Sequence, residues 1–136
     1  MQNPQCIRIL VADDNVINQT LFAKMLSVLG VQADVVDNGT KALEACQFQH
    51  YDMVFMDYQM PGTDGVEAAK SIKEINRTPK PVIILITANL LVNDYYLIHP
   101  GVVDDFLKKP FTLQEMADII EKWQPLFAVQ PPPNDK

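Results

Sequence analysis

The sequence predicts an α/β fold in which helices cover both faces of a parallel sheet. Five short apolar segments alternate along the chain with five segments of helical periodicity, and this alternation is typical of strand–helix–strand units. The apolar segments are continuous runs such as VIILI, as expected for strands that are buried on both faces. Because crossovers between parallel strands are right-handed, these units build a doubly wound five-stranded sheet. A chain of 136 residues is long enough for one such domain.

Each predicted strand is a short apolar run bounded by polar or turn-forming residues. The first is IRILVA, and the third, MVFM, runs directly into an aspartate. Asn38-Gly39 predicts a turn after the second strand, and Pro61-Gly62 and Asp64-Gly65 predict breaks after the third. The five predicted strands cover residues 7–12, 33–36, 53–56, 82–86 and 105–108.

Apolar residues at helical spacing fill the segments between these strands. The first predicted helix covers 15–29 and stops at Gly30, and its apolar positions are Ile17, Leu21, Met25, Val28 and Leu29. Thr112 and Glu115 form a capping-box sequence that opens the last helix. The remaining helices are predicted around Ala42–Cys46, over 66–75, over 89–99 and from Leu113 to Trp123.

Composition and charge exclude several classes of protein. The formal net charge of -6 argues against binding of nucleic acid through the overall field of the domain. No apolar run reaches the ~18 residues that a membrane span requires, and the first residues do not resemble a signal peptide. Cys6 and Cys46 have no metal-ligand spacing and are expected to be reduced thiols. We therefore expect a cytoplasmic domain that contacts neither nucleic acid nor membrane.

Polar side chains directly follow four of the five predicted strands. Asp13 and Asp14 come after the first strand, and Asp57 comes after the third. Thr87 follows the fourth strand, and Lys109 follows the last. In a doubly wound sheet these strand ends meet at one edge, where ligands bind. A single polar residue at a strand end needs no function, but five of these types together predict a site.

The charges in this set predict its chemistry. Two carboxylates ~4 Å apart repel each other by about 4 kcal/mol at an effective dielectric constant near 20. A hard divalent cation removes that cost, and an oxygen-only ligand set favours Mg²⁺, or Mn²⁺, over zinc. Lys109 offers a mobile positive charge and Thr87 a hydroxyl donor for a phosphoryl group. Asp57 is then predicted to be a nucleophile that forms an aspartyl phosphate.

Several motifs carry a resemblance to a known family: ILVADDN (9–15), MDYQMPGTDG (56–65), ITAN (86–89) and DDFLKKPF (104–111). Over residues 5–124 the chain resembles the receiver domains of two-component response regulators. The resemblance implies a flavodoxin-like (βα)5 fold with strand order 2-1-3-4-5. Residues 125–136, with three successive prolines, then form a tail or linker. NVINQ and TAN most resemble the receivers of hybrid sensor histidine kinases, so the domain is also expected as the cytoplasmic part of a larger membrane-bound kinase.

By position, the resemblance implies a phosphoacceptor within a magnesium site. Asp57 becomes the phosphoacceptor and one metal ligand. Asp14 becomes a direct ligand of Mg²⁺, and Asp13 acts partly through water. The backbone carbonyl of Gln59 completes the ligands that the protein supplies.

The resemblance also implies how the phosphoryl group is bound and read out. Thr87 would bind a phosphoryl oxygen, and Phe106 would change rotamer with it. Lys109 would form an ion pair at the site and precede a cis bond to Pro110. The phosphoryl donor would be a histidine kinase or a histidine phosphotransfer protein. Such a domain is not a classical enzyme, because it catalyses only its own phosphorylation and slow dephosphorylation.

Three other interpretations compete with this one. Haloacid-dehalogenase-like phosphatases also use an aspartate nucleophile after a strand, but they need a second aspartate where this chain has Gln59. A flavin-binding domain needs an uncharged phosphate loop after the first strand, whereas DDNVIN is acidic. A pseudo-receiver, which binds partners without phosphorylation, usually lacks an acidic residue or the lysine, and this chain keeps them all.

The segment from 89 to 106 departs from the family pattern. It is unusually apolar, and Pro100-Gly101 stands where receivers often have Ala-Gly. Its extra apolar residues either fill the core or form a partner surface. In the second case, a phosphorylation-dependent dimer or partner contact is expected through residues 89–108, including Tyr95, Tyr96 and Leu97.

Overall fold

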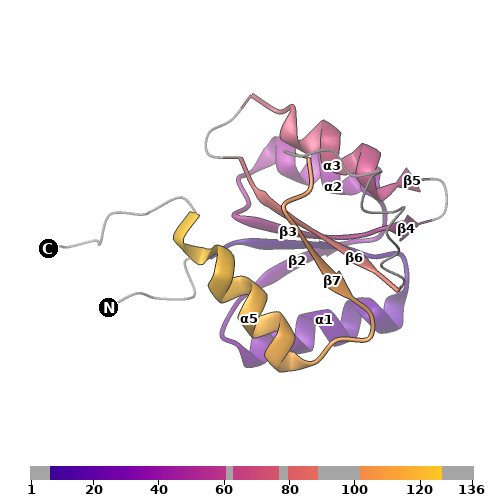
Figure 1. Cartoon of the computed structure of the whole chain (residues 1–136). Coiled ribbons are helices and arrows are strands. Elements are labelled where there is room, and N and C mark those ends of the chain that lie inside the picture. Colours follow the sequence, from indigo (N-terminus) through magenta and orange to yellow (C-terminus); the bar gives the residue numbers. More distant parts are fainter. Residues whose placement is uncertain (1–6, 61–62, 77–79, 89–101, 127–136) are drawn as a thin grey trace, which may run out of the picture.

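A five-stranded parallel sheet between two helical layers forms the centre of the computed structural model, which describes residues 7–60, 63–76, 80–88 and 102–126 (Figure 1). The strand order is β2-β1-β3-β6-β7. This is the predicted order 2-1-3-4-5, since β4 and β5 lie outside the sheet. The strands are β1 (Ile9–Ala12), β2 (Ala33–Val36), β3 (Met53–Asp57), β6 (Val82–Thr87) and β7 (Asp105–Lys108).

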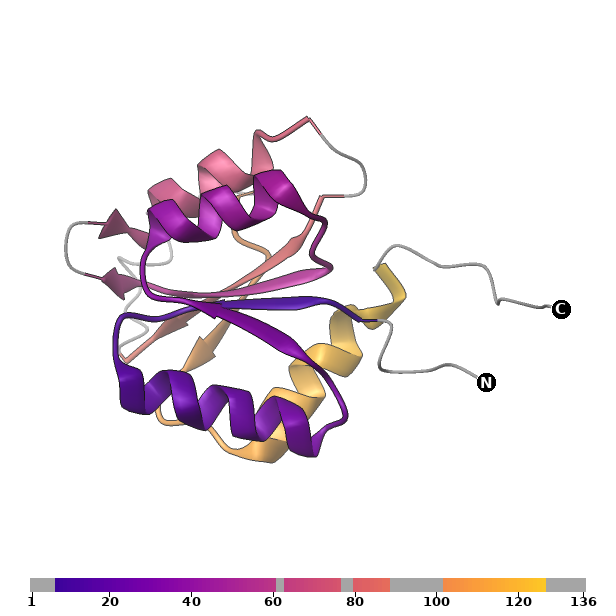
Figure 2. The same cartoon turned by 180° about the vertical axis from the view of Figure 1, so that it is seen from behind.

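Within the described residues, two helices cover each face of the sheet (Figures 1 and 2). On one face lie α1 (Val16–Val28) and α5 (Leu113–Trp123), which a short 3-10 helix, η2 (Gln124–Leu126), follows. On the other face lie α2 (Gly39–Phe48) and α3 (Gly65–Lys73). The predicted fourth helix, 89–99, lies outside the described residues. None of the helices within the described ranges is long and apolar enough to cross a membrane.

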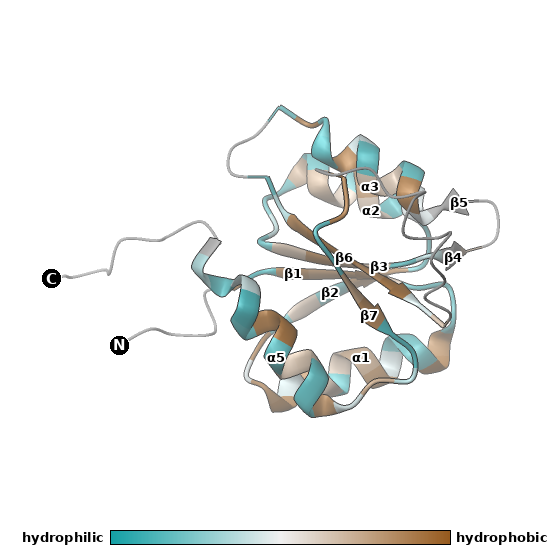
Figure 3. Ribbon diagram, viewed as in Figure 1, coloured by the Kyte–Doolittle hydropathy of each residue, from teal (hydrophilic) through white to brown (hydrophobic). Residues whose placement is uncertain are grey.

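Alternation along each strand builds a core on both faces of the sheet. In β1, Ile9 and Val11 pack with the α1/α5 layer, and Leu10 and Ala12 pack with the α2/α3 layer. This explains why β1 and β6 are continuous apolar runs, which appear largely brown in Figure 3. Fully buried residues of the strands include Leu10, Val11, Met53, Val54, Phe55, Met56, Ile83 and Ile84.

Side-chain caps begin three of the helices. The Asn15 side chain accepts a hydrogen bond from the N–H of Asn18 at the start of α1. Asn38 caps α2 in the same way, so the predicted Asn38-Gly39 turn is the start of a helix. The predicted capping box of α5 is confirmed, with both Thr112–Glu115 bonds present. Gly30 ends α1 with a φ of 81°, a conformation that favours glycine.

The helix predicted over 15–29 is present, but only some of the apolar residues that predicted it pack against the core, among them Met25 and Leu29. Ile17 is 77% exposed and Val28 70% exposed, whereas Phe22 and Leu26 are buried against the sheet. Apolar residues occur on two sides of this helix, so their spacing alone does not identify the buried side. The sequence predicted the helix but not its orientation.

Two local differences from the predicted elements have structural causes. The first strand begins at Ile9 rather than residue 7, because both neighbouring strands begin opposite Ile9, at Ala33 and Met53. The predicted break after the third strand contains a small antiparallel hairpin of β4 (Gln59–Met60) and β5 (Thr63–Asp64). This hairpin directly follows Asp57.

Candidate functional site

Four strands of the sheet deliver the predicted site residues to one edge. Asp13 follows β1, and its N–H donates to the carbonyl of Val36, which continues the ladder beyond the strand. Asp57 ends β3 and pairs with Ile86. Thr87 ends β6 and pairs with Lys108 of β7, so Lys109 emerges beside it. The prediction that these residues meet at the carboxyl edge is confirmed.

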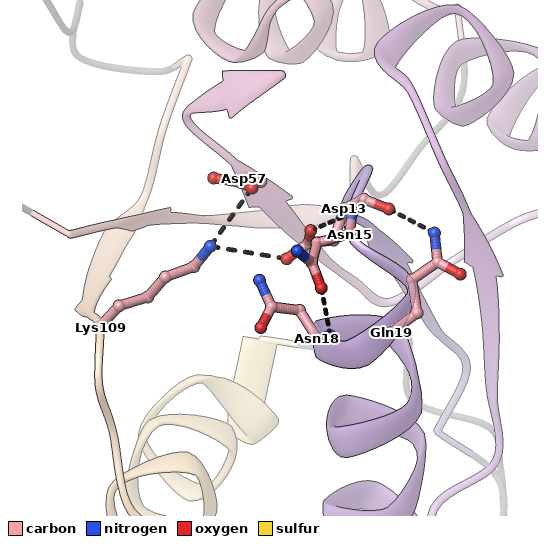
Figure 4. Close-up of polar contacts among 6 residues, drawn as sticks. All are labelled: Asp13, Asn15, Asn18, Gln19, Asp57 and Lys109. Carbon is pink, nitrogen blue, oxygen red and sulfur yellow. Dashed lines mark hydrogen bonds and ion pairs between the residues drawn. The ribbon is translucent and has the colours of Figure 1, made fainter. Parts of the chain in front are cut away.

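Three carboxylates and one ammonium group meet at this edge. Figure 4 shows two of the carboxylates, Asp13 and Asp57, with Lys109. Ligand oxygens of Asp13, Asp14 and Asp57 lie within 4.8 Å of one another. Lys109 Nζ lies 3.3 Å from Asp57 Oδ2 and 3.6 Å from Asp13 Oδ2. Asp13 and Asp57 are buried and Asp14 is exposed. One lysine therefore faces two buried carboxylates, which leaves the cluster with excess negative charge.

One carboxylate oxygen of the cluster has no hydrogen bond to any residue that the structure describes. Asp13 Oδ1 accepts from the N–H of Asn15 at 2.9 Å. Asp13 Oδ2 is buried and, among the described residues, has no hydrogen-bond partner, since Lys109 Nζ is too far away at 3.6 Å. A buried anionic oxygen in this state is costly unless a cation compensates it. Since Mg²⁺ prefers carboxylate oxygens, this oxygen and its two neighbouring carboxylates fit the predicted ion.

Polar residues near the opposite edge of the sheet have partners. The Tyr51 hydroxyl donates to Asp34 Oδ2, and Gln49 Nε2 donates to the same carboxylate oxygen at 2.9 Å. Arg8 Nη2 donates to Gln49 Oε1. Burial, together with the hydrogen bond to Asp34, raises the pKa of Tyr51 to about 12. The polar groups of this network hydrogen-bond one another, so the network needs no ligand to account for it. The Asp13 cluster differs, because one of its buried oxygens has no hydrogen bond within the described residues.

Comparison with known proteins decides the family. The sequence model of the response regulator receiver domain matches residues 9–121 of the chain. The chain belongs to the response regulator receiver domain family.

Relatives of this receiver domain include parts of much longer kinases. It is 37% identical over 123 residues to hybrid signal transduction histidine kinase K of Dictyostelium discoideum. That match covers 85% of the chain but only 10% of the kinase.

Solved structures confirm the receiver fold. The receiver domain of sensor histidine kinase PA1611 from Pseudomonas aeruginosa, solved with a magnesium ion in its active-site cleft, is 33% identical with a TM-score of 0.79. The match covers 86% of this chain and 96% of that one. The receiver domain of Ssk1 from Saccharomyces cerevisiae, solved with the histidine phosphotransfer protein Ypd1, is 28% identical with a TM-score of 0.75. That match covers 90% and 91% of the two chains.

The predicted readout residues of this receiver domain lie on adjacent strands. Thr87 is buried at the end of β6. Phe106 pairs with Leu85, two residues before Thr87, and packs against the core of the α2/α3 layer. Because alternate residues share a face, Thr87 and Phe106 belong to the same side of the sheet.

A carboxylate beside Phe106 fixes this edge strand to α5. Asp105 Oδ1 accepts from the Phe106 N–H, and Asp105 Oδ2 accepts from Lys122 Nζ and Trp123 Nε1, each at 2.8 Å. Burial alone would raise the pKa of Asp105, but these donors outweigh it and hold that pKa below its usual value. The strand that carries Phe106 is thus anchored on its opposite face.

The loop after the predicted phosphoacceptor of the receiver domain is packed tightly against α3. A Cβ atom on Gly65, the first residue of α3, would lie 2.6 Å from the carbonyl oxygen of Asp57. Gln59, whose carbonyl is a predicted metal ligand, pairs with Asp64 in the hairpin between them. The backbone of Asp57 and Tyr58 therefore lies against the start of α3, and the backbone of Gln59 is held in the hairpin. The Lys109–Pro110 bond is cis, as the resemblance implied.

A groove and an exposed apolar helix face adjoin the site. The groove has a volume of about 360 Å³ and is lined by Asn18, Leu21, Phe22, Ala88, Lys109, Pro110 and Phe111. On α1 next to it, Val16 and Ile17 are exposed, and Leu21 is half-exposed. Lys109 thus belongs both to the carboxylate cluster and to the groove.

Two residues that contact the backbone of the site were missed from the sequence. Gln19 Nε2 donates to the Asp13 carbonyl at 2.6 Å, and Gly65 approaches the Asp57 carbonyl. The glycine had a signal, the Asp64-Gly65 break. The glutamine had none, because its contact depends on how α1 is turned against β1.

Proposed function

We propose that this receiver domain takes a phosphoryl group from a phosphohistidine onto the carboxylate of Asp57 in the presence of Mg²⁺. It then slowly hydrolyses the aspartyl phosphate that it has formed. The observation that carries this proposal is the buried Asp13 oxygen beside Asp57 and Lys109, which has no hydrogen bond within the described part of the chain. A cluster of this kind is poised for a cation and for a ligand that brings its own negative oxygens.

The proposed metal residues are those of the acidic cluster and its adjoining loop. Asp14 and Asp57 supply carboxylate oxygens, the Gln59 carbonyl supplies a third oxygen, and Asp13 acts partly through water. When bound, the ion neutralises charge on the phosphoryl oxygens and so favours attack by a carboxylate. Support comes from the ligand oxygens of the three carboxylates, which all lie within 4.8 Å of one another.

The proposed transfer requires little more than positioning and charge. A carboxylate oxygen of Asp57 attacks phosphorus, the P–N bond of the donor breaks, and the imidazole leaves with a proton from solvent. Lys109, already 3.3 Å from Asp57 Oδ2, can follow the new negative charge onto the phosphoryl oxygens. The Thr87 hydroxyl donates a hydrogen bond to another of these oxygens. In the later hydrolysis, water attacks the same phosphorus, the P–O bond to Asp57 breaks, and inorganic phosphate and the free carboxylate are released.

We place the histidine-bearing partner over the start of α1. The exposed side chains of Val16 and Ile17, with Leu21 at the rim of the groove, form an apolar surface beside Lys109. Exposed apolar surface of this kind marks protein contacts. A histidine phosphotransfer protein has been solved with a similar receiver domain, and we propose this class of partner, or a histidine kinase, for this chain.

Replacing Ile17 by serine is expected to slow phosphorylation by a protein donor but not phosphorylation by acetyl phosphate. Transfer from a phosphorylated histidine phosphotransfer protein should slow at least fivefold, corresponding to the roughly 1 kcal/mol that an interface anchor contributes. Phosphorylation by acetyl phosphate should be unchanged, since a small molecule needs no docking surface. Rapid-quench transfer assays measure both rates.

Val28→Ser is the matched control for this experiment. Val28 is as exposed as Val16 but lies at the other end of α1, roughly 18 Å along the helix at 1.5 Å per residue. It should leave both rates unchanged. Equal slowing of both rates in Ile17→Ser would remove the docking proposal and leave the phosphoacceptor proposal intact.

We also propose that Thr87 couples phosphorylation to Phe106. Movement of the Thr87 hydroxyl towards a phosphoryl oxygen opens space on the face that it shares with Phe106. The aromatic ring fills that space, and the outer surface near β7 changes. We propose that a dimer or partner contact through residues 89–108 would depend on this change. Most of these residues lie outside the described ranges.

Thr87→Ala should accept a phosphoryl group at Asp57 but fail to transmit the change. NMR shift mapping with and without beryllofluoride, a phosphate mimic, measures this over residues 102–108. In the parent protein the Phe106 and Leu107 amides should shift, and in Thr87→Ala those shifts should fall by more than half. Identical shifts in both proteins would exclude Thr87 as the coupling residue.

A further inference from the structure

The peptide bond that joins Asp13 to Asp14 is held by a side chain from the second turn of α1. Gln19 Nε2 donates to the carbonyl oxygen of Asp13 at 2.6 Å (Figure 4). The Gln19 N–H donates in turn to the carbonyl of Asn15, so the residue is anchored in the helix. A helical residue thus reaches back across the β1–α1 connection to the backbone of the acidic pair.

Within the described residues, other hydrogen bonds hold Asp13, whereas the Asp14 side chain has none. The Asp13 N–H is bonded to Val36 of β2, and Asp13 Oδ1 accepts from the Asn15 N–H. Asp14 is exposed. The direction in which its side chain leaves the backbone depends on the plane of the preceding peptide, whose carbonyl is the group that Gln19 binds. The hydrogen bond from Gln19 to the Asp13 carbonyl therefore influences the direction of the Asp14 side chain.

We propose that Gln19 is a positioning residue for the cation site, which orients the Asp13–Asp14 peptide so that the Asp14 carboxylate faces Asp57. The inference rests on the function proposed above. Without the Gln19 donor, the Asp13 carbonyl loses a partner in a partly buried place, and the peptide plane is free to rotate. Repulsion from Asp13 and Asp57 then moves the Asp14 carboxylate outwards, since its ligand oxygen lies within 4.8 Å of theirs.

Gln19→Ala should bind Mg²⁺ about fivefold to tenfold more weakly than the parent protein, near the lower limit for loss of a residue that orients a metal ligand. Mg²⁺ titration followed through the NMR shifts of the Asp57 and Thr87 amides measures the affinity without any phosphorylation. Gln19→Met, which keeps the length of the side chain but has no donor, should give the same result and serves if the alanine variant does not fold.

A double-mutant cycle with Asp14→Asn separates positioning from general support of the fold. If Gln19 acts through Asp14, Gln19→Ala should change Mg²⁺ affinity less than twofold in the Asp14→Asn background. Gln114→Ala is the matched control, because Gln114 Nε2 donates to Asp118 within α5 at 2.8 Å and, among the described residues, makes no hydrogen bond to the acidic cluster. It should leave the affinity unchanged.

The outcomes distinguish this inference from the function on which it rests. A parent protein that does not respond to Mg²⁺ would overturn the proposed metal site and Gln19 with it. Two other results would overturn only the role of Gln19, provided that the parent protein binds Mg²⁺. One is a Mg²⁺ affinity of Gln19→Ala within twofold of the parental affinity. The other is that Gln19→Ala lowers the affinity by the same factor with and without Asp14→Asn.

Discussion

Replacing Asp57 by asparagine should abolish phosphorylation of the domain by acetyl phosphate or a phosphohistidine donor. Asparagine keeps the size of the side chain but has no anionic oxygen to attack phosphorus. Asp57 is the buried carboxylate that Lys109 approaches most closely, at 3.3 Å. Intact-protein mass measurement should show one added phosphoryl group, labile to hydroxylamine, in the parent protein and less than about one hundredth of it in Asp57→Asn, a loss of at least 2.7 kcal/mol in transition-state stabilisation.

The variant should remain folded, which makes its loss of labelling interpretable. Removing one of three clustered carboxylates lowers their mutual repulsion and offsets the lost ion pair with Lys109. Circular dichroism checks the fold. Asp118→Asn, at an exposed carboxylate on α5, controls for the substitution itself and should label as the parent does. Labelling that survives in Asp57→Asn at the parental level would show that another residue accepts the phosphoryl group.

Gly65→Ala should lower the free energy of unfolding by about 2 kcal/mol, within the usual cost of overpacking. Its Cβ would lie 2.6 Å from the Asp57 carbonyl oxygen and 3.1 Å from Tyr58 Cα, both of them backbone atoms that cannot rotate away. In the first turn of a helix alanine is otherwise the better residue by up to ~1 kcal/mol, so the sign of the change tests the contact. Urea denaturation measures it.

The same substitution should slow phosphorylation, because the displaced backbone carries Asp57. We expect a reduction of roughly tenfold under conditions in which the protein remains folded, since a misplacement of about 1 Å can cost more than that. Lys70→Ala, at an exposed site on the same helix, should change neither stability nor labelling by more than a small factor. If the Gly65→Ala variant were as stable as the parent, α3 would have to move away from Asp57 and Tyr58 at no cost, which would contradict the predicted clash.

The strands and the site edge were predictable because burial on both faces leaves a strong trace in the sequence. A run such as Val82–Ile86 has no room for polar residues until the sheet ends at Thr87. In a parallel sheet that end is also the functional edge. The polar residues that follow the strands are therefore both the signal that ends each strand and the parts of the site.

Orientation and close approach were not predictable from the same patterns. Helix α1 has apolar residues on two sides, and tertiary packing places Phe22 and Leu26 inward while Ile17 and Val28 remain exposed. The contact of Gln19 with Asp13 follows from that orientation. Pairing of Gln59 with Asp64 joins segments whose intervening residues are typical of a turn, so the short hairpin has no periodic signal of its own.

The most direct test of the account is to locate the acyl phosphate chemically. Borohydride reduces an aspartyl phosphate to homoserine, which peptide mass spectrometry assigns to a position. After treatment of the parent protein with acetyl phosphate and Mg²⁺, homoserine is expected at position 57, and chelation of the metal before phosphorylation should prevent its formation. Homoserine at Asp13 or Asp14, or equal amounts at position 57 with and without Mg²⁺, would contradict the proposed site. No homoserine anywhere in the folded parent would instead favour a pseudo-receiver that binds partners without phosphorylation.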